Sequence, residues 1–206
     1  MTALDWPKCE NARDLGGLPT VDGAALRSAA LYRSDGLFRL STAGMAAVRA
    51  AALARIIDLR WQRECDLDPS PFAGDAIYRH VPMLEEELTY EVPHDTYAPM
   101  LDHNQGRIAA AFRALAAAPA GGGVLVHCHG GRDRTGVLVA LALAIAGVPA
   151  EEIAADYGRS PERPPVAMAN TLTYLDENYG DAESYLLRIG VPAADIAAVR
   201  RRLVGG

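Results

Sequence analysis

The sequence predicts an α/β fold in which a central, mostly parallel sheet is flanked by helices and followed by a C-terminal helical layer. Strand and helix patterns alternate as far as residue 147, which is typical of parallel sheets. From Pro149 onward only helical patterns occur. At the end of the alternating region, a short apolar strand pattern leads through the glycine-rich segment 127–136 into a helix pattern that is apolar on nearly all sides. Such a helix belongs in the centre of a protein.

The first strand, helix, strand unit is predicted between residues 30 and 59. ALYRS at 30–34 and RIIDL at 55–59 read as strands, and a helix capped by Ser41 or Thr42 connects them. Apolar and polar residues alternate over 76–82, which predicts a further strand ending at Pro82.

Residues 84–106 follow this strand as a long segment with clustered acids, scattered aromatics and two prolines. Loops longer than about 12 to 15 residues are uncommon unless they act as lids or binding segments. We therefore expect a partly helical flap over a functional site.

The remaining elements follow from apolar spacing and from helix-ending residues. A helix is predicted over 107–119, a buried strand over 124–127 and the central helix over 135–147, with Gly147 at its end. The C-terminal helical part, about 149–206, contains helix patterns at 150–158, 168–180, 182–190 and 192–204, and the proline-rich segment 158–166 is expected to be a surface connection.

Length and composition favour one compact domain over residues 1–206. Half of the residues are hydrophobic, and no internal repeat is present. The formal net charge of −6 has the wrong sign for a protein that binds nucleic acid or anionic lipid through its overall charge. We expect no nucleic-acid partner, and any bound anion must meet a local positive site.

Cysteine usage and the N-terminus favour a cytoplasmic protein. Cys9, Cys65 and Cys128 are far apart and odd in number, which argues against a disulfide framework. No apolar signal region is visible, and the longest apolar run, 136–150, is shorter than the roughly 18 to 20 residues that a membrane span needs. Secretion by a route without a signal would leave no trace here, and the sequence does not indicate an oligomeric state.

The segment HCHGGRDRTG at 127–136 has the composition of an anion-binding loop. A strand, a glycine-rich turn and a helix start direct backbone N–H groups and the positive end of the helix dipole toward one point. Cys128 and Arg134 are separated by five residues, enough for the loop to surround one tetrahedral anion. The guanidinium group can grip two phosphate oxygens at once.

The same positive field would turn Cys128 into a nucleophile. A helix N-terminus and neighbouring cations can lower a thiol pKa from about 8.5 to about 5. A thiolate beneath a bound phosphate implies in-line attack at phosphorus and a phosphocysteine intermediate. Thr135 can donate a hydrogen bond to the sulfur when water cleaves that intermediate.

This loop resembles the Cys-x5-Arg-Thr signature of the protein tyrosine phosphatase superfamily. It is most similar to bacterial tyrosine and lipid phosphatases whose loop reads HCxxGKDRTG, although Arg132 stands where they usually have lysine. The segments NARDLGG, LYRSDGL, IIDLRWQRE and GVPAEEIAADY, at 11–17, 31–37, 56–64 and 147–157, resemble other recurrent family segments. The resemblance covers most of the chain and implies a phosphotyrosine phosphatase-like fold.

The resemblance also implies roles for individual residues. Cys128, Arg134 and Asp133 are the expected catalytic residues. The phosphate is expected to contact the loop residues His129, Gly130, Gly131, Arg132, Asp133, Arg134 and Thr135, and the expected supporting residues are His127, Asp58, Arg60 and Arg13. No metal site is expected, because His127 and His129 flank Cys128 too closely for all three to reach one ion, and no cofactor is implied.

The proton donor to the leaving group is open among three candidates. Many family members use an aspartate on a mobile loop, but here Glu85, Glu86 and Glu87 follow the corresponding strand. Asp133 lies inside the anion loop, as in the myotubularin-like lipid phosphatases, and is the favoured candidate. Asp58, at the end of the strand 55–59, is the third.

We therefore expect a phosphomonoester hydrolase that acts on phosphotyrosine proteins, and also on phosphoserine, phosphothreonine or phosphoinositides. Its partners would be phosphorylated proteins or lipid headgroups, without stable membrane insertion. One alternative is a phytase-like enzyme for inositol polyphosphates, which the acidic net charge and LEEE at 84–87 disfavour. Another is a phosphate-recognition module without catalysis, although such modules usually lack the cysteine or the arginine. A rhodanese-like sulfurtransferase is disfavoured because it would not require Arg134 and Thr135.

Overall fold

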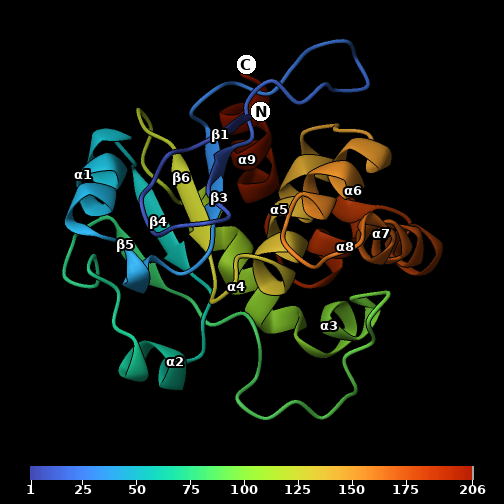
Figure 1. The fold of residues 1–206 in the computed structure, drawn as a ribbon. Coiled ribbons are helices and arrows are strands. Elements are labelled where there is room, and N and C mark those ends of the chain that lie inside the picture. The colour runs from blue at the N-terminus through green and yellow to red at the C-terminus, as the bar shows by residue number, and fades with distance from the viewer. Residues whose placement is uncertain (206) are drawn as a thin grey trace.

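The computed structural model describes residues 1–205 and contains one six-stranded sheet flanked by helices (Figure 1). The strand order is β1-β2-β3-β6-β4-β5. The last four strands of this order run parallel, whereas β1 and β2 form an antiparallel edge. The predicted fold class is therefore confirmed. The strands are β1 (Thr2–Ala3), β2 (Arg13–Asp14), β3 (Leu31–Ser34), β4 (Arg55–Asp58), β5 (Tyr78–His80) and β6 (Val124–His127).

The helices cover both faces of the sheet and form the C-terminal layer. They are η1 (Leu37–Arg39), α1 (Thr42–Ala50), α2 (Gln62–Leu67), α3 (Ala98–His103), α4 (Gln105–Ala116), α5 (Asp133–Ile145), α6 (Ala150–Gly158), α7 (Pro165–Tyr179), α8 (Ala182–Arg188) and α9 (Ala193–Val204). Within residues 1–205, no helix is both long and apolar enough to cross a membrane. Ser41 caps α1 by accepting a hydrogen bond from the N–H of Gly44, at 3.1 Å.

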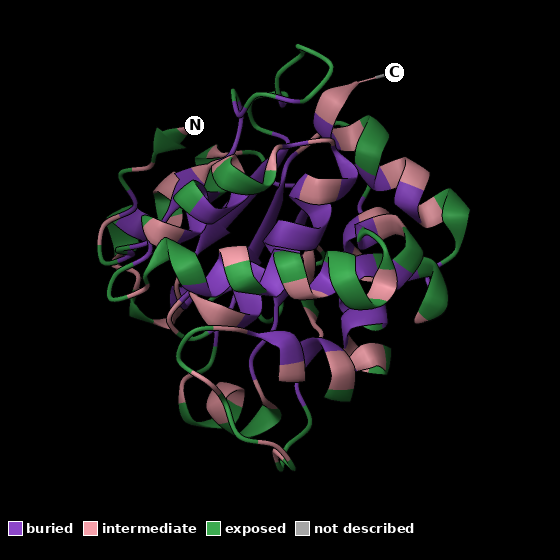
Figure 2. Cartoon of the chain, turned by 90° about the vertical axis from the view of Figure 1, so that its right-hand side faces the viewer, coloured by how far each residue is buried: buried purple, intermediate pink, exposed green. Residues whose placement is uncertain are grey.

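Strand side chains alternate between two hydrophobic clusters, one on each face of the sheet. In β6, Val124 and Val126 belong to the larger cluster with α4, α5 and α9, whereas Leu125 belongs to the smaller cluster with Val48 of α1. This alternation follows from the two-residue period of a strand. The central strands β3, β4 and β6 and most of helix α5 are buried, whereas the outward faces of the surrounding helices are exposed (Figure 2).

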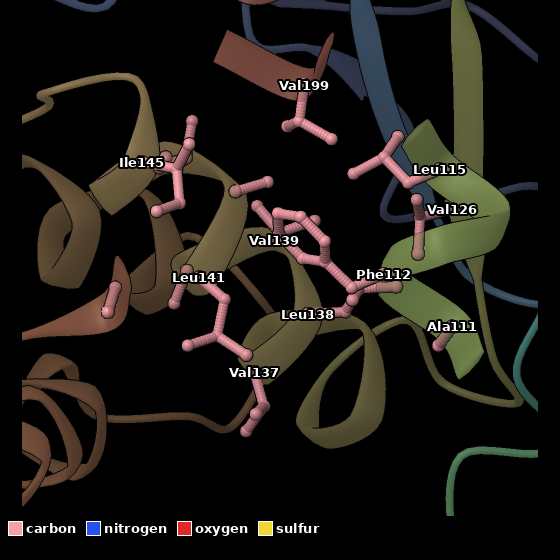
Figure 3. Close-up of a cluster of buried hydrophobic side chains, with 14 of the residues drawn as sticks. Ala111, Phe112, Leu115, Val126, Val137, Leu138, Val139, Leu141, Ile145 and Val199 are labelled. Carbon is pink, nitrogen blue, oxygen red and sulfur yellow. The ribbon is translucent and has the colours of Figure 1, made fainter. Parts of the chain in front are cut away.

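Helix α5 lies at the centre of the larger cluster, as its apolar sequence predicts. Phe112 of α4, Val126 of β6 and Val199 of α9 surround it (Figure 3). It begins at Asp133, two residues earlier than expected, which places Arg134 and Thr135 in its first turn. The chain leaves the helix through Gly147, whose φ of 79° is a conformation that favours glycine.

Some elements have no signal in the sequence. Strands β1 and β2 have two residues each, too few to show a period, and α2 has no buried residue, so it has no apolar stripe. Helix α7 begins at Pro165, inside the segment 158–166 that was expected to be a connection. Proline is well suited to a first helical turn because that turn needs no N–H donor from it.

The segment 84–106 is partly helical, as expected, because it contains α3. Its inner side is anchored by Tyr97, Met100 and Leu101, which are buried, whereas Glu85 and its two following glutamates are exposed. The segment is therefore attached to the core near α3 and open to solvent near its start.

Candidate active site

The segment 128–134 connects β6 to α5 at the carboxyl end of the parallel strands. His127, the last residue of β6, lies between Ser34 of β3 and Asp58 of β4 in the strand register. Cys128 follows directly and is only 3% exposed. Carboxyl ends of parallel strands are the usual place for ligands in α/β proteins.

Three consecutive carbonyl groups of this loop point outward, into hydrogen bonds with the surrounding chain. The carbonyl of His129 accepts from the N–H of Gly36 at 2.8 Å. The Nδ2 group of Asn11 donates to the carbonyls of Gly130 and Gly131, at 3.4 and 3.0 Å. In a trans peptide the N–H lies opposite the C=O, so the following N–H groups, at 130, 131 and 132, point into the loop. Such a nest of N–H groups binds anions.

Gly131 allows the loop to approach β3 closely. Its φ is 64°, in the left-handed region, and a Cβ atom there would lie 2.2 Å from the carbonyl oxygen of Ser34. No other residue fits this position without displacing backbone.

A buried ion cluster supports the loop from behind. Asp156 of α6 accepts from Arg13 and from Arg33, each at 2.7 Å. Arg33 also donates to the carbonyl of Gly131 at 2.9 Å. Burial alone would raise the pKa of Asp156, but Arg33 and Arg13 outweigh burial and lower it. Arg13, an expected supporting residue, does not contact the loop directly. It donates to Asn11, which contacts the loop carbonyls, and it pairs with Asp156, which also pairs with Arg33.

Arg134 is held by Glu64 of α2. Its two terminal nitrogens donate to the two carboxylate oxygens, at 2.5 and 2.9 Å, and its guanidinium lies 4.6 Å from the ring centre of Trp61. Burial would raise the pKa of Glu64, but the interactions with Arg134 lower it. Glu64 is a residue that sequence reasoning missed, although it lies in the family-like segment 56–64.

Thr135 lies in the first turn of α5 with its hydroxyl group buried. Within residues 1–205 this hydroxyl has no hydrogen-bond partner. A buried hydroxyl without a partner is unfavourable in the free protein, so it is available to a group that arrives or ionises in the loop.

Asp133 connects the loop to two other segments. Its carboxylate accepts a hydrogen bond from the Tyr97 hydroxyl. It also forms an ion pair with Arg163, whose Nε lies 2.7 Å from Oδ1 of Asp133. Burial would raise the pKa of Asp133, but Arg163 and Tyr97 lower it below its usual value. Tyr97 also shares a hydrogen bond with Tyr157 at 2.5 Å. The flap, the segment 158–166 and the loop therefore meet at this carboxylate.

At the end of β4, Asp58 and Arg60 form an ion pair that is inaccessible to solvent, with a terminal nitrogen of Arg60 2.7 Å from Oδ2 of Asp58. The Tyr78 hydroxyl donates a hydrogen bond to the same oxygen at 2.8 Å. Burial would raise the pKa of Asp58, but His127 and Arg60 lower it well below its usual range. His127 is itself inaccessible, and burial lowers its pKa. These three expected supporting residues lie together beside the base of the loop.

The flap glutamates face outward. Glu85 pairs with Arg107 at 2.6 Å, and Glu86 lies 3.9 Å from Arg63. Glu87 is exposed. In the free protein, Glu85 and Glu86 are thus held against neighbouring arginines on the surface.

Aromatic rings and one exposed ion pair form the rim of the loop. The ring of His129 lies 5.2 Å from that of Phe38, and Trp61 covers Arg134 on another side. Arg132 stands at the position where the similar bacterial loops usually have lysine, and it forms an ion pair with Glu162 at 2.7 Å. In the described part of the chain, no three His, Cys, Asp or Glu side chains gather as a metal site would require.

A buried cysteine at the base of an N–H nest, with an arginine at its far end, defines the class of cysteine-based phosphatases. Residues 4–205 match the model of the tyrosine phosphatase family. The chain belongs to this family, which confirms the family and the enzyme class expected from the sequence.

Two relatives in sequence carry phosphatase names, and one solved structure shares the fold. The chain is 27% identical to the triple specificity protein phosphatase PtpB of Mycobacterium tuberculosis, over 87% of this chain and 76% of that protein. It is 31% identical to a putative tyrosine-protein phosphatase of Cupriavidus necator, over 78% of this chain, and it spans only 63% of that relative's length. Its fold resembles the core catalytic domain of the PP-IP phosphatase SIW14 from S. cerevisiae, with a TM-score of 0.50 and 18% identity, over 85% of this chain and 90% of that chain.

Proposed function

We propose that this protein hydrolyses phosphomonoesters through a phosphocysteine intermediate, with phosphotyrosine in proteins as its main substrate class. The observation that carries the proposal is the outward anchoring of three loop carbonyls around Cys128. It leaves three N–H groups and Arg134 to hold the phosphate oxygens over the sulfur.

In the first step, the Cys128 thiolate attacks phosphorus. A sulfur–phosphorus bond forms while the bond to the leaving oxygen breaks, and that oxygen takes a proton from an acid. In the second step, a water oxygen bonds to phosphorus while the sulfur–phosphorus bond breaks, and the water gives a proton to the carboxylate that the first step left deprotonated. The products are inorganic phosphate and the Cys128 thiolate. The Thr135 hydroxyl, in the first turn of α5, has no other partner in residues 1–205 and would donate a hydrogen bond to this thiolate.

Glu64 serves as a positioning residue for Arg134. Its two carboxylate oxygens each accept one hydrogen bond, one from each terminal nitrogen of the Arg134 guanidinium group. The Nε–H and the outer terminal hydrogens remain for two phosphate oxygens, which suits the fork geometry of arginine. Glu64 thus fixes the plane of the clamp before the substrate arrives.

Asp133 is the proposed proton donor. Its position within the loop supports this role, and a bound phosphate dianion beside it would raise its lowered pKa toward the range of a working acid. Asp58 is less suited because it is inaccessible and strongly ionised, and Glu85 is less suited because Arg107 holds it at the surface.

The aromatic rim supports a preference for aryl phosphates. Phe38 and the ring of His129 stand together at the loop, and Trp61 lies over the clamp arginine. A phosphotyrosine ring reaching the loop would meet aromatic faces, which favour ring contacts. Phosphoserine, phosphothreonine and phosphoinositides, which the sequence also led us to expect, are the next substrates to compare. One relative is named a triple specificity protein phosphatase, which supports comparing more than one substrate class.

One substrate panel tests the proposal. Phosphotyrosine peptide, phosphoserine peptide, a phosphoinositide and an inositol polyphosphate are offered to the wild type and to Cys128→Ser. We expect turnover to be highest on phosphotyrosine and abolished by the serine variant. Equal turnover by Cys128→Ser would contradict the covalent mechanism. Binding without turnover on every substrate would instead support a recognition module.

A further inference from the structure

The amino ends of the parallel strands, at the opposite edge of the sheet from the loop 128–134, border a cavity of about 520 Å³. The turns that precede β3, β4 and β6 line it with Ala29, Ala52 and Gly121. β6 has four residues at about 3.3 Å each, so roughly 13 Å of strand separates this cavity from the catalytic loop. It is therefore a separate site.

The backbone of this cavity is tightly defined. Ala29, Ala52 and Gly121 all have positive φ values, of 59°, 49° and 89°, and L residues such as alanine rarely adopt this conformation. A Cβ atom on Gly122 would lie 2.6 Å from the carbonyl oxygen of Ala52, so the turns pack directly on one another. Within residues 1–205, no hydrogen-bond acceptor is found for the N–H groups of Gly121 and Gly122.

Three arginines supply the charge of the cavity. Arg27 comes from the turn before β3, and Arg201 and Arg202 come from the end of α9. No aspartate or glutamate lines the cavity, and among the described residues no carboxylate lies within salt-bridge distance of these three side chains. In a chain with a net charge of −6, these arginines are a local concentration of positive charge that no carboxylate of residues 1–205 pairs with.

Arg202 is fixed in the wall, and its neighbours repel it. It donates to the carbonyls of Gly122 and Pro119, both at 2.8 Å. Burial lowers its pKa, and the nearby charges of Arg27 and Arg55 lower it further. An anion in the cavity would relieve this repulsion.

We propose that this basic cavity, formed by Arg27, Arg201 and Arg202, is a second anion-binding site that takes a small ligand with two or more phosphate groups. The guanidinium groups come from two separate walls, so one ligand can bridge them through different phosphates. Charge-assisted hydrogen bonds from arginine are the strongest available contacts for such a ligand. The ligand is either a soluble phosphate compound or the phosphorylated headgroup of a lipid, since both present the same chemistry.

Inorganic pyrophosphate is the first probe, and its binding is measured by calorimetry. The protein used is Arg134→Ala, because this change impairs anion binding at the loop 128–134. We expect the remaining binding to weaken about tenfold or more when Arg27→Ala and Arg201→Ala are added, because charge-assisted contacts are lost. Arg188→Ala, an exposed arginine on α8, is the matched control and should leave this binding unchanged. Equal affinity with and without the double change would overturn the proposal.

Two further measurements complete the test. With Arg134 intact, the Arg27→Ala/Arg201→Ala protein should hydrolyse p-nitrophenyl phosphate like the wild type, which separates this site from the catalytic loop and shows that the protein is folded. Flotation of Arg134→Ala with phosphatidylcholine vesicles, with and without a phosphatidylinositol bisphosphate, then identifies the source. Binding to the bisphosphate vesicles that the Arg27→Ala/Arg201→Ala change removes indicates a lipid headgroup, whereas pyrophosphate binding without vesicle binding indicates a soluble ligand.

Discussion

Single contacts at the loop can be tested for their part in the proposed chemistry, beginning with the bidentate pair of Glu64 with Arg134. We expect Glu64→Gln to lower kcat about tenfold, because an amide cannot hold both terminal nitrogens and the clamp loses its fixed plane. KM should change less, since Arg134 keeps its charge. The control is Glu177→Gln, a change at an exposed glutamate on α7, which should have wild-type kinetics. A wild-type kcat for Glu64→Gln would contradict the positioning role.

The proposed role of Asp133 as proton donor predicts that the effect of its replacement depends on the leaving group of the substrate. We expect Asp133→Asn to reduce turnover of phosphoserine peptide by about 100-fold or more, and that of p-nitrophenyl phosphate far less, because only a poor leaving group needs the proton. A uniform loss on both substrates would indicate that Asp133 positions the loop and does not donate the proton.

The ion pair between Arg163 and Asp133 also predicts a shift in pH dependence. Arg163 lowers the pKa of Asp133, so Arg163→Ala should raise that pKa. If Asp133 is the proton donor, as proposed, it must be protonated to act, so the limb of kcat/KM that falls with rising pH should move to higher pH for phosphoserine peptide. Arg159→Ala, an exposed neighbour, is the control. An unchanged profile in Arg163→Ala would remove Asp133 as the titrating group.

Whole elements determine whether the loop can close around an anion, and Gly131 tests this at the junction with β3. We expect Gly131→Ala to raise the inhibition constant for inorganic phosphate by more than 100-fold, because its Cβ would overlap the backbone of Ser34 and move the N–H nest. Gly23→Ala is the matched control, since its φ of 83° carries the same conformational strain with nothing within 4 Å of the added atom. Equal effects of the two changes would mean that strain alone is responsible.

The elements also show which parts of the structure the sequence could predict. The central strands, α5 and the loop were predictable because their periods and glycine positions are local patterns. The partners of the loop were not, because Asn11, Glu64 and Asp156 reach it from distant segments. Arg33 and Asp156, for example, are separated by 123 positions and pair only after the sheet and α6 have formed. Local patterns do not carry such pairings.

At the scale of the whole molecule, the cluster of Arg13, Arg33 and Asp156 joins the antiparallel edge of the sheet to the C-terminal helical layer. Asp156→Asn should lower the free energy of unfolding by about 3 to 5 kcal/mol, because two buried guanidinium groups would lose their counter-charge. Asp75→Asn breaks a partly exposed pair with Arg49 and should cost no more than about 1 kcal/mol. Denaturant titration measures both.

The same cluster predicts how stability depends on pH. The pKa of Asp156 is lowered in the folded protein, so its contribution is complete above the unfolded-state pKa of about 3.9 and is lost as pH falls through the folded value. The difference in unfolding free energy between wild type and Asp156→Asn should therefore be constant near neutrality and shrink as the solution is acidified below about pH 4. A difference that stays constant into this acidic range would show that the amide destabilises the protein through packing and not through the lost charge. In that case the cluster would support the loop by shape alone.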